Sequence, residues 1–175
     1  MAWCVTALGV LAVGAEAGLV AGLAVSLLLY IWRTANPHIV EVGNPPNSDL
    51  FVEVERHHEL NIWPQLPLVR IDESLFFGNA SAVQNFLVHK ISTRPSVTDI
   101  ILICSAVNAI DASALHMLED LVDSLGQGGV VVHLAEVKAA VRDRLESTRL
   151  LQQVGRGRLH ASAAAAISAI ASRPI

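Results

Sequence analysis

Apolar residues dominate the first part of the chain, and residues 2–32 contain a single charged side chain, Glu16. One straight helix over this run would be roughly 46 Å long at 1.5 Å per residue, whereas the hydrocarbon core of a bilayer is about 30 Å thick. The run is also longer than the apolar core of a signal peptide, and no positive charge precedes it. We therefore expect a transmembrane segment over residues 1–33, either one steeply tilted helix or two short helices broken near 14–18, and we favour the second.

The glycines of this run follow a regular spacing, because Gly14, Gly18 and Gly22 lie four residues apart. Such a spacing puts small residues on one helix face, where another membrane helix can approach closely. Glycine is also common in membrane helices in general, and the sequence leaves both interpretations open. Glu16 could belong to an ion pathway, but the flanking glycines favour an acid at a helix turn near the membrane interface.

The end of the apolar run has the composition of a membrane interface. Tyr30 and Trp32 are amphipathic aromatic residues, and Arg33 follows them directly. Aromatic side chains gather at the level of the lipid headgroups, and positive charges are retained on the cytoplasmic side. The sequence therefore predicts that the chain is cytoplasmic from Arg33 onward.

From residue 34 onward, strand-like and helix-like hydrophobic patterns alternate. Extended segments are expected at residues 38–42, 51–55, 68–71, 74–77, 98–104, 130–134 and 158–160. A 3.6-residue period predicts helices from Asn79 or Ser81 to residue 92, and over 112–125, 139–151 and 162–172. Strands that alternate with helices are typical of an α/β sheet with right-handed crossovers. We divide this part into a linker with the first strands, 34–66, and a cytoplasmic domain, 67–175.

Charge and cysteine content exclude two further classes of protein. The formal net charge is −4, so no broad basic field favours nucleic acid as a partner. Cys4 falls in the membrane segment and Cys104 in an expected buried strand. This pair excludes a disulfide framework and agrees with a reducing cytosol.

Motifs for catalysis, metal binding and cofactor binding are missing from the sequence. Neither G-x-x-x-x-G-K-[ST] nor G-x-G-x-x-G after a strand occurs. His57 and His58 are adjacent, so their side chains diverge and do not favour a metal pair. The basic stretch 155–158 is expected to be a turn before a strand rather than an anion site. We therefore expect no enzyme activity, no cofactor and no metal.

Two segments carry a more specific signal. Residues 69–80 predict a strand, a turn and a short strand that feed a helix, and residues 107–118 predict a loop that feeds a helix with Asp at its start. Together they resemble the STAS domain at the C-terminus of sulfate permease (SulP) family anion transporters. The stretches 16–29 and 32–38 are similar to the last membrane hairpin of that family and to the exit from it. The resemblance covers essentially the whole chain.

The resemblance implies an architecture and a function. The fold would be a small mixed sheet covered by helices, preceded by one or two transmembrane helices. Members of the family are multi-pass secondary transporters of sulfate-like anions, built from inverted repeats in the cell (inner) membrane. Their anion-binding site lies on helices that this chain lacks, so we expect a C-terminal portion that does not transport by itself. Its implied partners are the membrane, the remaining transporter helices, a second copy in a homodimer, and a cytoplasmic regulatory protein.

The domain is also similar to bacterial anti-sigma-factor antagonists, which carry a regulatory serine directly after an aspartate at a helix start. Here Ala112 occupies that position, and Ser113 follows one residue later. Asp111 and Ser113 favour helix capping, although modification of Ser113 remains open. The candidate regulatory and docking surface is therefore Asp111, Ala112, Ser113 and His116. The alternative function is a stand-alone membrane-tethered STAS module that binds a signalling partner through this helix.

Overall fold

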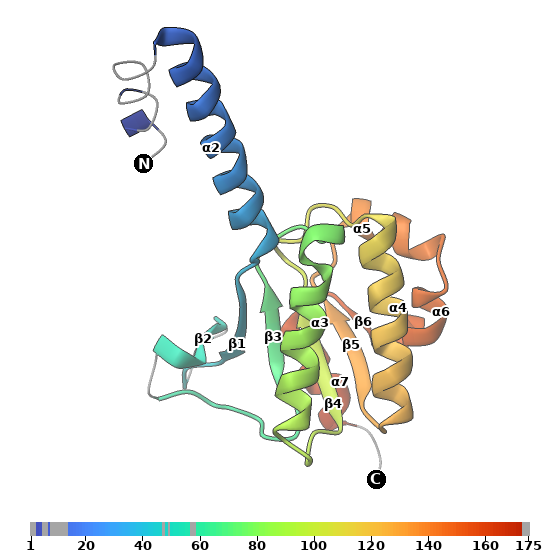
Figure 1. Ribbon diagram of the computed structural model, residues 1–175. Helices are drawn as coiled ribbons and strands as arrows, with labels where there is room; N and C mark the ends of the chain where they lie inside the picture. The colour runs from blue at the N-terminus through green and yellow to red at the C-terminus, as the bar shows by residue number, and fades with distance from the viewer. Residues whose placement is uncertain are drawn as a thin grey trace. The chain divides into compact units, whose positions relative to one another are not determined.

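The computed structural model describes residues 3, 4, 7, 14–46, 48, 50–56 and 59–172. These residues fall into two compact units, 1–36 and 37–175, which are described separately (Figure 1). Most of the first of the two expected membrane helices lies outside the described residues, as do His57 and His58.

The first unit contains one long apolar helix, α2, which spans Ala15–Ala35. This helix is long and apolar enough to cross a membrane. Gly14 precedes it with φ of +111°, a conformation that glycine adopts readily. The helix has begun at Ala15, so residues 15–18 of the expected break are helical. The carboxylate of Glu16 suits the first helical turn, where the helix dipole favours negative charge.

The second unit is built on a six-stranded mixed sheet with the order β2-β1-β3-β4-β5-β6. Strand β1 is antiparallel to β2 and β3, and β3 to β6 run parallel to one another. The strand bounds are Ile39–Gly43 (β1), Val52–Glu53 (β2), Leu68–Ile71 (β3), Asp99–Ile103 (β4), Val131–Ala135 (β5) and Leu159–His160 (β6). The predicted α/β class is confirmed, with the antiparallel strands confined to one side.

The helices cover the two faces of this sheet unequally. Four helices pack on one face: α3 (Phe77–Ser92), α4 (Ala112–Gln127), α5 (Ala139–Glu146) and α6 (Leu150–Val154). Because β3 to β6 lie in sequence order and parallel crossovers are right-handed, each connecting helix falls on the same side. The opposite face is covered by α7 (Ala163–Ala171), through Ala163 and Ala166. Short 3₁₀ turns occupy Val54–Arg56 and Arg156–Arg158.

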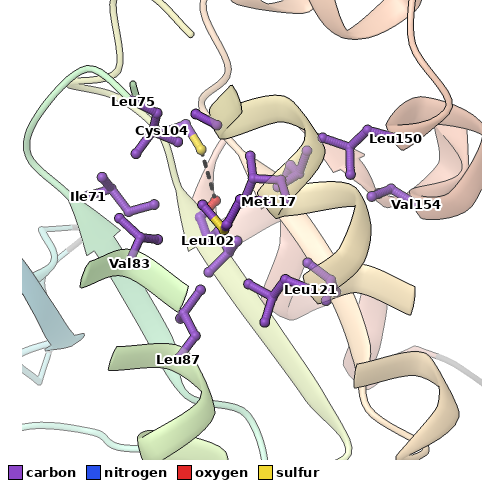
Figure 2. Packing of buried hydrophobic residues seen from close by; sticks show 14 of the residues in the cluster. Ile71, Leu75, Val83, Leu87, Leu102, Cys104, Met117, Leu121, Leu150 and Val154 are labelled. Carbon is purple, nitrogen blue, oxygen red and sulfur yellow. Dashed lines mark hydrogen bonds between the residues drawn. The ribbon is translucent and has the colours of Figure 1, made fainter. Parts of the chain in front are cut away.

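The larger core lies between the sheet and helices α3 to α6 (Figure 2). Strand β4 is buried on both faces: Ile100 and Leu102 point into this core, and Ile101 and Ile103 point toward α7. The prediction of a strand covered on both sides is confirmed. Cys104 ends the strand inside the larger core, where burial raises the pKa of its thiol to about 12, so the side chain stays a neutral core group.

Two local predictions were wrong. The helix expected over 139–151 is two helices, separated at residues 147–149, where the Ser147 and Thr148 hydroxyls bond to carbonyls of the preceding turn. Side-chain bonds of this kind compete with helix continuation. The extended piece expected at 74–77 is a single bridge at Leu75, and α3 begins at Phe77 rather than after Asn79.

A buried acidic residue ties β1 to α3. Glu41 is 8% exposed. It accepts hydrogen bonds from Arg94 at 2.5 and 2.9 Å, and it pairs with Lys90 at 2.8 Å. Burial by itself raises the pKa of Glu41, but the hydrogen bonds and charges of Arg94 and Lys90 outweigh it and hold the pKa below its ordinary value.

We predict that Glu41→Gln lowers the free energy of unfolding by about 2 kcal/mol at neutral pH, because hydrogen bonds to the charged carboxylate are lost. Glu41 has a lowered pKa in the folded state, so its contribution is present above the ordinary pKa of 4.5 and is lost as the pH falls through the folded-state value. Urea unfolding of the full chain in detergent, at neutral pH and near pH 4, measures both effects. Glu73→Gln, at an exposed turn residue, is the matched control, and equal stability of the two variants would contradict the prediction.

Candidate functional site

The helices α3 and α4 begin close together, beyond the carboxyl ends of β3 and β4. Leu75 and Ile110 form a parallel bridge between the two loops that lead into these helices. The Leu75 N–H donates to the Ala109 carbonyl at 3.0 Å, and the Asp111 N–H donates to the Leu75 carbonyl at 3.1 Å. The loop ends are therefore joined as a short continuation of the sheet, at the edge where open α/β sheets usually bind ligands.

Asp111 joins the first turns of both helices. Its Oδ1 accepts a hydrogen bond from the Ala114 N–H at 2.8 Å, which is the predicted cap of α4. Its Oδ2 accepts a second hydrogen bond from the Phe77 N–H, the first residue of α3, at 2.9 Å. The sequence predicted the first bond, but the second links residues 34 positions apart and had no local signal.

Two more polar side chains hold the loops in place: Asn79, which was predicted as a possible cap but lies inside the first turn of α3, and Ser74, whose role was not predicted. Asn79 is fully buried; its Oδ1 accepts from the Phe76 N–H at 3.0 Å, and its Nδ2 donates to the Ser74 carbonyl at 2.8 Å. Ser74 Oγ accepts hydrogen bonds from the N–H groups of Asn108 and Ala109, both at 3.2 Å. These bonds satisfy loop backbone groups that α3 and α4 leave unpaired.

The outer surface of this junction exposes chemically varied side chains. Ala112 and Ser113 are exposed in the first turn of α4, and the His116 side chain is 80% exposed, with Nδ1 3.4 Å from Glu119 Oε2. Phe77, whose backbone N–H donates to Asp111, is 75% exposed. An exposed phenylalanine in the first turn of a helix is a signal that the sequence reasoning did not use.

Electrostatics keep Asp111 ionised. Partial burial by itself raises its pKa, but hydrogen bonds from the N–H groups of Ala114, Phe77 and Ser113 lower it, together with the charge of Arg144. The carboxylate therefore already occupies the anion-favouring start of α4. A phosphate on Ser113 would lie two residues from this negative charge, and like charges repel.

The predicted membrane residues Glu16, Gly18 and Gly22 lie in the first half of α2, and Gly14 directly precedes the helix. Gly18 and Gly22 are buried one turn apart, while Gly14 is the exposed residue before the helix. Glu16 is exposed in the first turn. The structure thus separates the three glycines, because only two of them lie within the helix.

A separate group of His38, Glu53 and Asp72 has the atom spacing of a metal site, with ligand atoms within 4.8 Å of one another. Arg70 bonds to Asp72 at 2.6 Å and lies 3.6 Å from Glu53, and Arg56 lies 2.7 Å from Glu53. The two guanidinium groups already balance the two carboxylates, so this donor set fits an ion-pair network better than a cation site.

Comparisons with known proteins agree on one family. A family model described as the STAS domain matches residues 54–166. Sulfate transporter 1.2 of Arabidopsis thaliana is 25% identical over 170 residues, which are 92% of this chain and 26% of the relative. The chain therefore spans about a quarter of the length of such curated relatives.

Solved structures give the same fold. The murine Slc26a9 anion transporter in its inward-facing state superposes with a TM-score of 0.85 at 19% identity, over 98% of this chain and 28% of that chain. The SulP transporter STAS domain from Vibrio cholerae has a TM-score of 0.55 at 19% identity, over 68% of this chain and 91% of that domain. A putative anti-sigma factor antagonist from Thermotoga maritima has a TM-score of 0.54 at 18% identity, over 62% of this chain and 89% of that chain.

We predict that Asp111→Ala lowers the free energy of unfolding by about 2 kcal/mol, because it removes the cap of α4 and the acceptor for the first N–H of α3 together. Hydrogen exchange at the Phe77 and Ala114 amides, with chemical denaturation of the full chain, measures the effect. Asp120→Ala, at an exposed position inside α4, is the control. Faster exchange at Ala114 alone would show that the link to α3 contributes no stability.

Proposed function

This chain belongs to the STAS domain family, and from that premise we propose that it is the C-terminal portion of a SulP-type secondary transporter of sulfate-like anions. In this proposal α2 belongs to the membrane part, and the domain from Pro37 onward serves regulation, assembly and partner docking on the cytoplasmic side. The remaining transporter helices, a second copy and a cytoplasmic regulatory protein are the proposed partners. The relatives are transporters rather than enzymes.

The observation that carries the proposal is the extent of the similarity. The STAS family model matches residues 54–166, but the sulfate transporter relatives align over 92% and 95% of the chain, and so they include α2. A helix shared with a transporter supports an origin in a membrane bundle more strongly than the domain fold does. Two buried glycines on one side of α2 support the same interpretation, because small residues permit close helix packing.

We place the docking function at the start of α4. The backbone there is held rigidly by Asp111, while Ala112, Ser113 and His116 remain exposed. A rigid helix start with exposed small and polar side chains allows a partner to approach the backbone closely. The neighbouring exposed ring of Phe77 supplies apolar contact area, which is the usual anchor of a protein interface.

The second candidate function is a stand-alone membrane-tethered STAS module that binds a signalling partner. The exposure of Ser113 in the first turn of α4 favours it, since a modifying enzyme could reach the hydroxyl. Ala112 at the usual acceptor position weighs against a phosphate switch. We therefore favour the transporter portion.

An antibody against residues 51–175 separates the two candidates when it is applied to membrane and soluble fractions of cells that make the protein. A transporter portion predicts either a membrane band several times larger than 18.7 kDa or a larger native complex that contains the 18.7 kDa chain. A stand-alone module predicts a membrane band at 18.7 kDa that runs as a free species in mild detergent. That second result would contradict the proposal.

Gly18→Ile tests the proposed helix packing. Because a branched side chain blocks close approach, we expect the complex in mild detergent to lose its large form while the chain stays in the membrane fraction. Native electrophoresis measures the size of the complex. The matched control is Val20→Ile, at an exposed position of the same helix. An unchanged complex in both variants would contradict a packing role for the Gly18 face of α2.

A further inference from the structure

Three ionisable side chains form a line across the sheet face that α7 covers. Asp99 of β4, His133 of β5 and His160 of β6 come from adjacent strands. His133 Nε2 lies 3.1 Å from Asp99 Oδ1, and His133 Nδ1 lies 3.0 Å from His160 Nε2. His133 is 1% exposed and Asp99 is 7% exposed. The buried cluster beside this polar line consists of apolar residues.

The neighbouring elements contribute few other charges to this line. Helix α7 and the segment 62–66 carry no ionisable side chain. Glu136, which follows β5, donates its N–H to the His160 carbonyl at 3.1 Å and accepts the first N–H of α7 at 3.3 Å. Arg158 lines a hollow with residues of α4, and Arg70 is engaged in ion pairs near β1 and β2.

The contact between the two histidines limits how many protons they hold together. A 3.0 Å distance between two ring nitrogens is a hydrogen bond when one nitrogen carries a proton and the other is an acceptor. His133 Nε2 must also carry a proton to donate to the Asp99 carboxylate. The pair can accept one additional proton, which makes His133 an imidazolium that donates to both neighbours. A second additional proton would place two N–H groups face to face.

The last elements of the chain are held to the sheet by few contacts. Strand β6 pairs with β5 over two residue positions. Helix α7 buries Ala163 and Ala166, while Ile167 and Ile170 pack only partly against the core. Alanine provides little apolar area, so this region has the composition of a segment that opens without global unfolding. The hydrogen bond between His133 and His160 is one of the contacts that close it.

We propose that Asp99, His133 and His160 form an acid-sensitive latch that holds β6 and α7 on the sheet. In the closed state the two histidines hold at most one additional proton between them. In the open state both rings reach water and each titrates in the range in which histidine changes charge, between about pH 5 and pH 8. The open state therefore binds more protons as the pH falls, and acid favours opening.

Opening would uncover the small core that α7 protects. Ile101 and Ile103 of β4 lie in that core, and Trp63 packs against it. Proton binding thus shifts the equilibrium from the state in which α7 covers this sheet face to the state in which the face is exposed. This proposal stands on the geometry of the domain and is independent of whether the chain is a transporter portion.

Hydrogen exchange of the full chain in detergent, followed by mass spectrometry, tests the latch. Peptides over 159–171 report opening of β6 and α7, and peptides over 80–91 of α3 report global unfolding. After correction for intrinsic exchange chemistry, a difference of one bound proton raises the open fraction by up to about tenfold per pH unit. We expect this acceleration between about pH 6.5 and pH 5 in 159–171, with no matching change in 80–91.

His160→Gln is the decisive variant, because its amide can donate to or accept from His133 Nδ1 but does not titrate. We expect it to keep 159–171 protected and to remove the pH dependence. His89→Gln, at an exposed position in the last turn of α3, should keep the pH dependence of the unmodified chain. A flat profile in the unmodified chain, an equal slope in His160→Gln, or equal slopes in both peptides would each overturn the latch.

Discussion

The parallel pairing of β3, β4 and β5 in sequence order is the constraint on which the rest of the domain depends. Each strand is joined to the next by a helix, and right-handed crossovers in one direction put α3 to α6 on the same face. The larger core forms there. The opposite face is covered by α7 and by residues between β1 and β3, among them Trp63 and Leu66, and its core is smaller. The same pairing brings the starts of α3 and α4 together, so the candidate docking surface follows from topology rather than from a separate motif.

Buried polar groups form hydrogen bonds and ion pairs that attach β1 to α3 and β6 to β5. Glu41 attaches the edge of the sheet to the end of α3 through Arg94 and Lys90. The line of Asp99, His133 and His160 does the same for β6 on the other side. Removing a polar group from water costs free energy unless its hydrogen bonds are replaced. The folded domain therefore loses stability when one of these side chains loses its charge or changes its protonation state. The two polar groups thus lie on opposite sides of β3, one on β1 and the other across β4 to β6.

Membership of the STAS family and similarity to sulfate transporters across α2 place the domain beside a membrane bundle in our proposal. Asp111 then links two helices of that domain. One carboxylate accepts hydrogen bonds from the first turns of two helices, α3 and α4. Exposed Phe77 and Ser113 lie within this rigid frame, which limits the entropy that binding must remove.

Local features of the sequence determined the apolar helix, the doubly buried strand β4, the cap of α4 by Asp111 and the α/β class. Each of these depends on residues within one turn or one strand, where periodicity and capping rules apply. The tertiary structure decided the second bond of Asp111 to Phe77, the pairing of Glu41 with Arg94 across 53 positions, and the burial of His133 between Asp99 and His160. No short window of sequence contains both partners of the long-range bonds, so they exist only once the sheet has brought distant strands together.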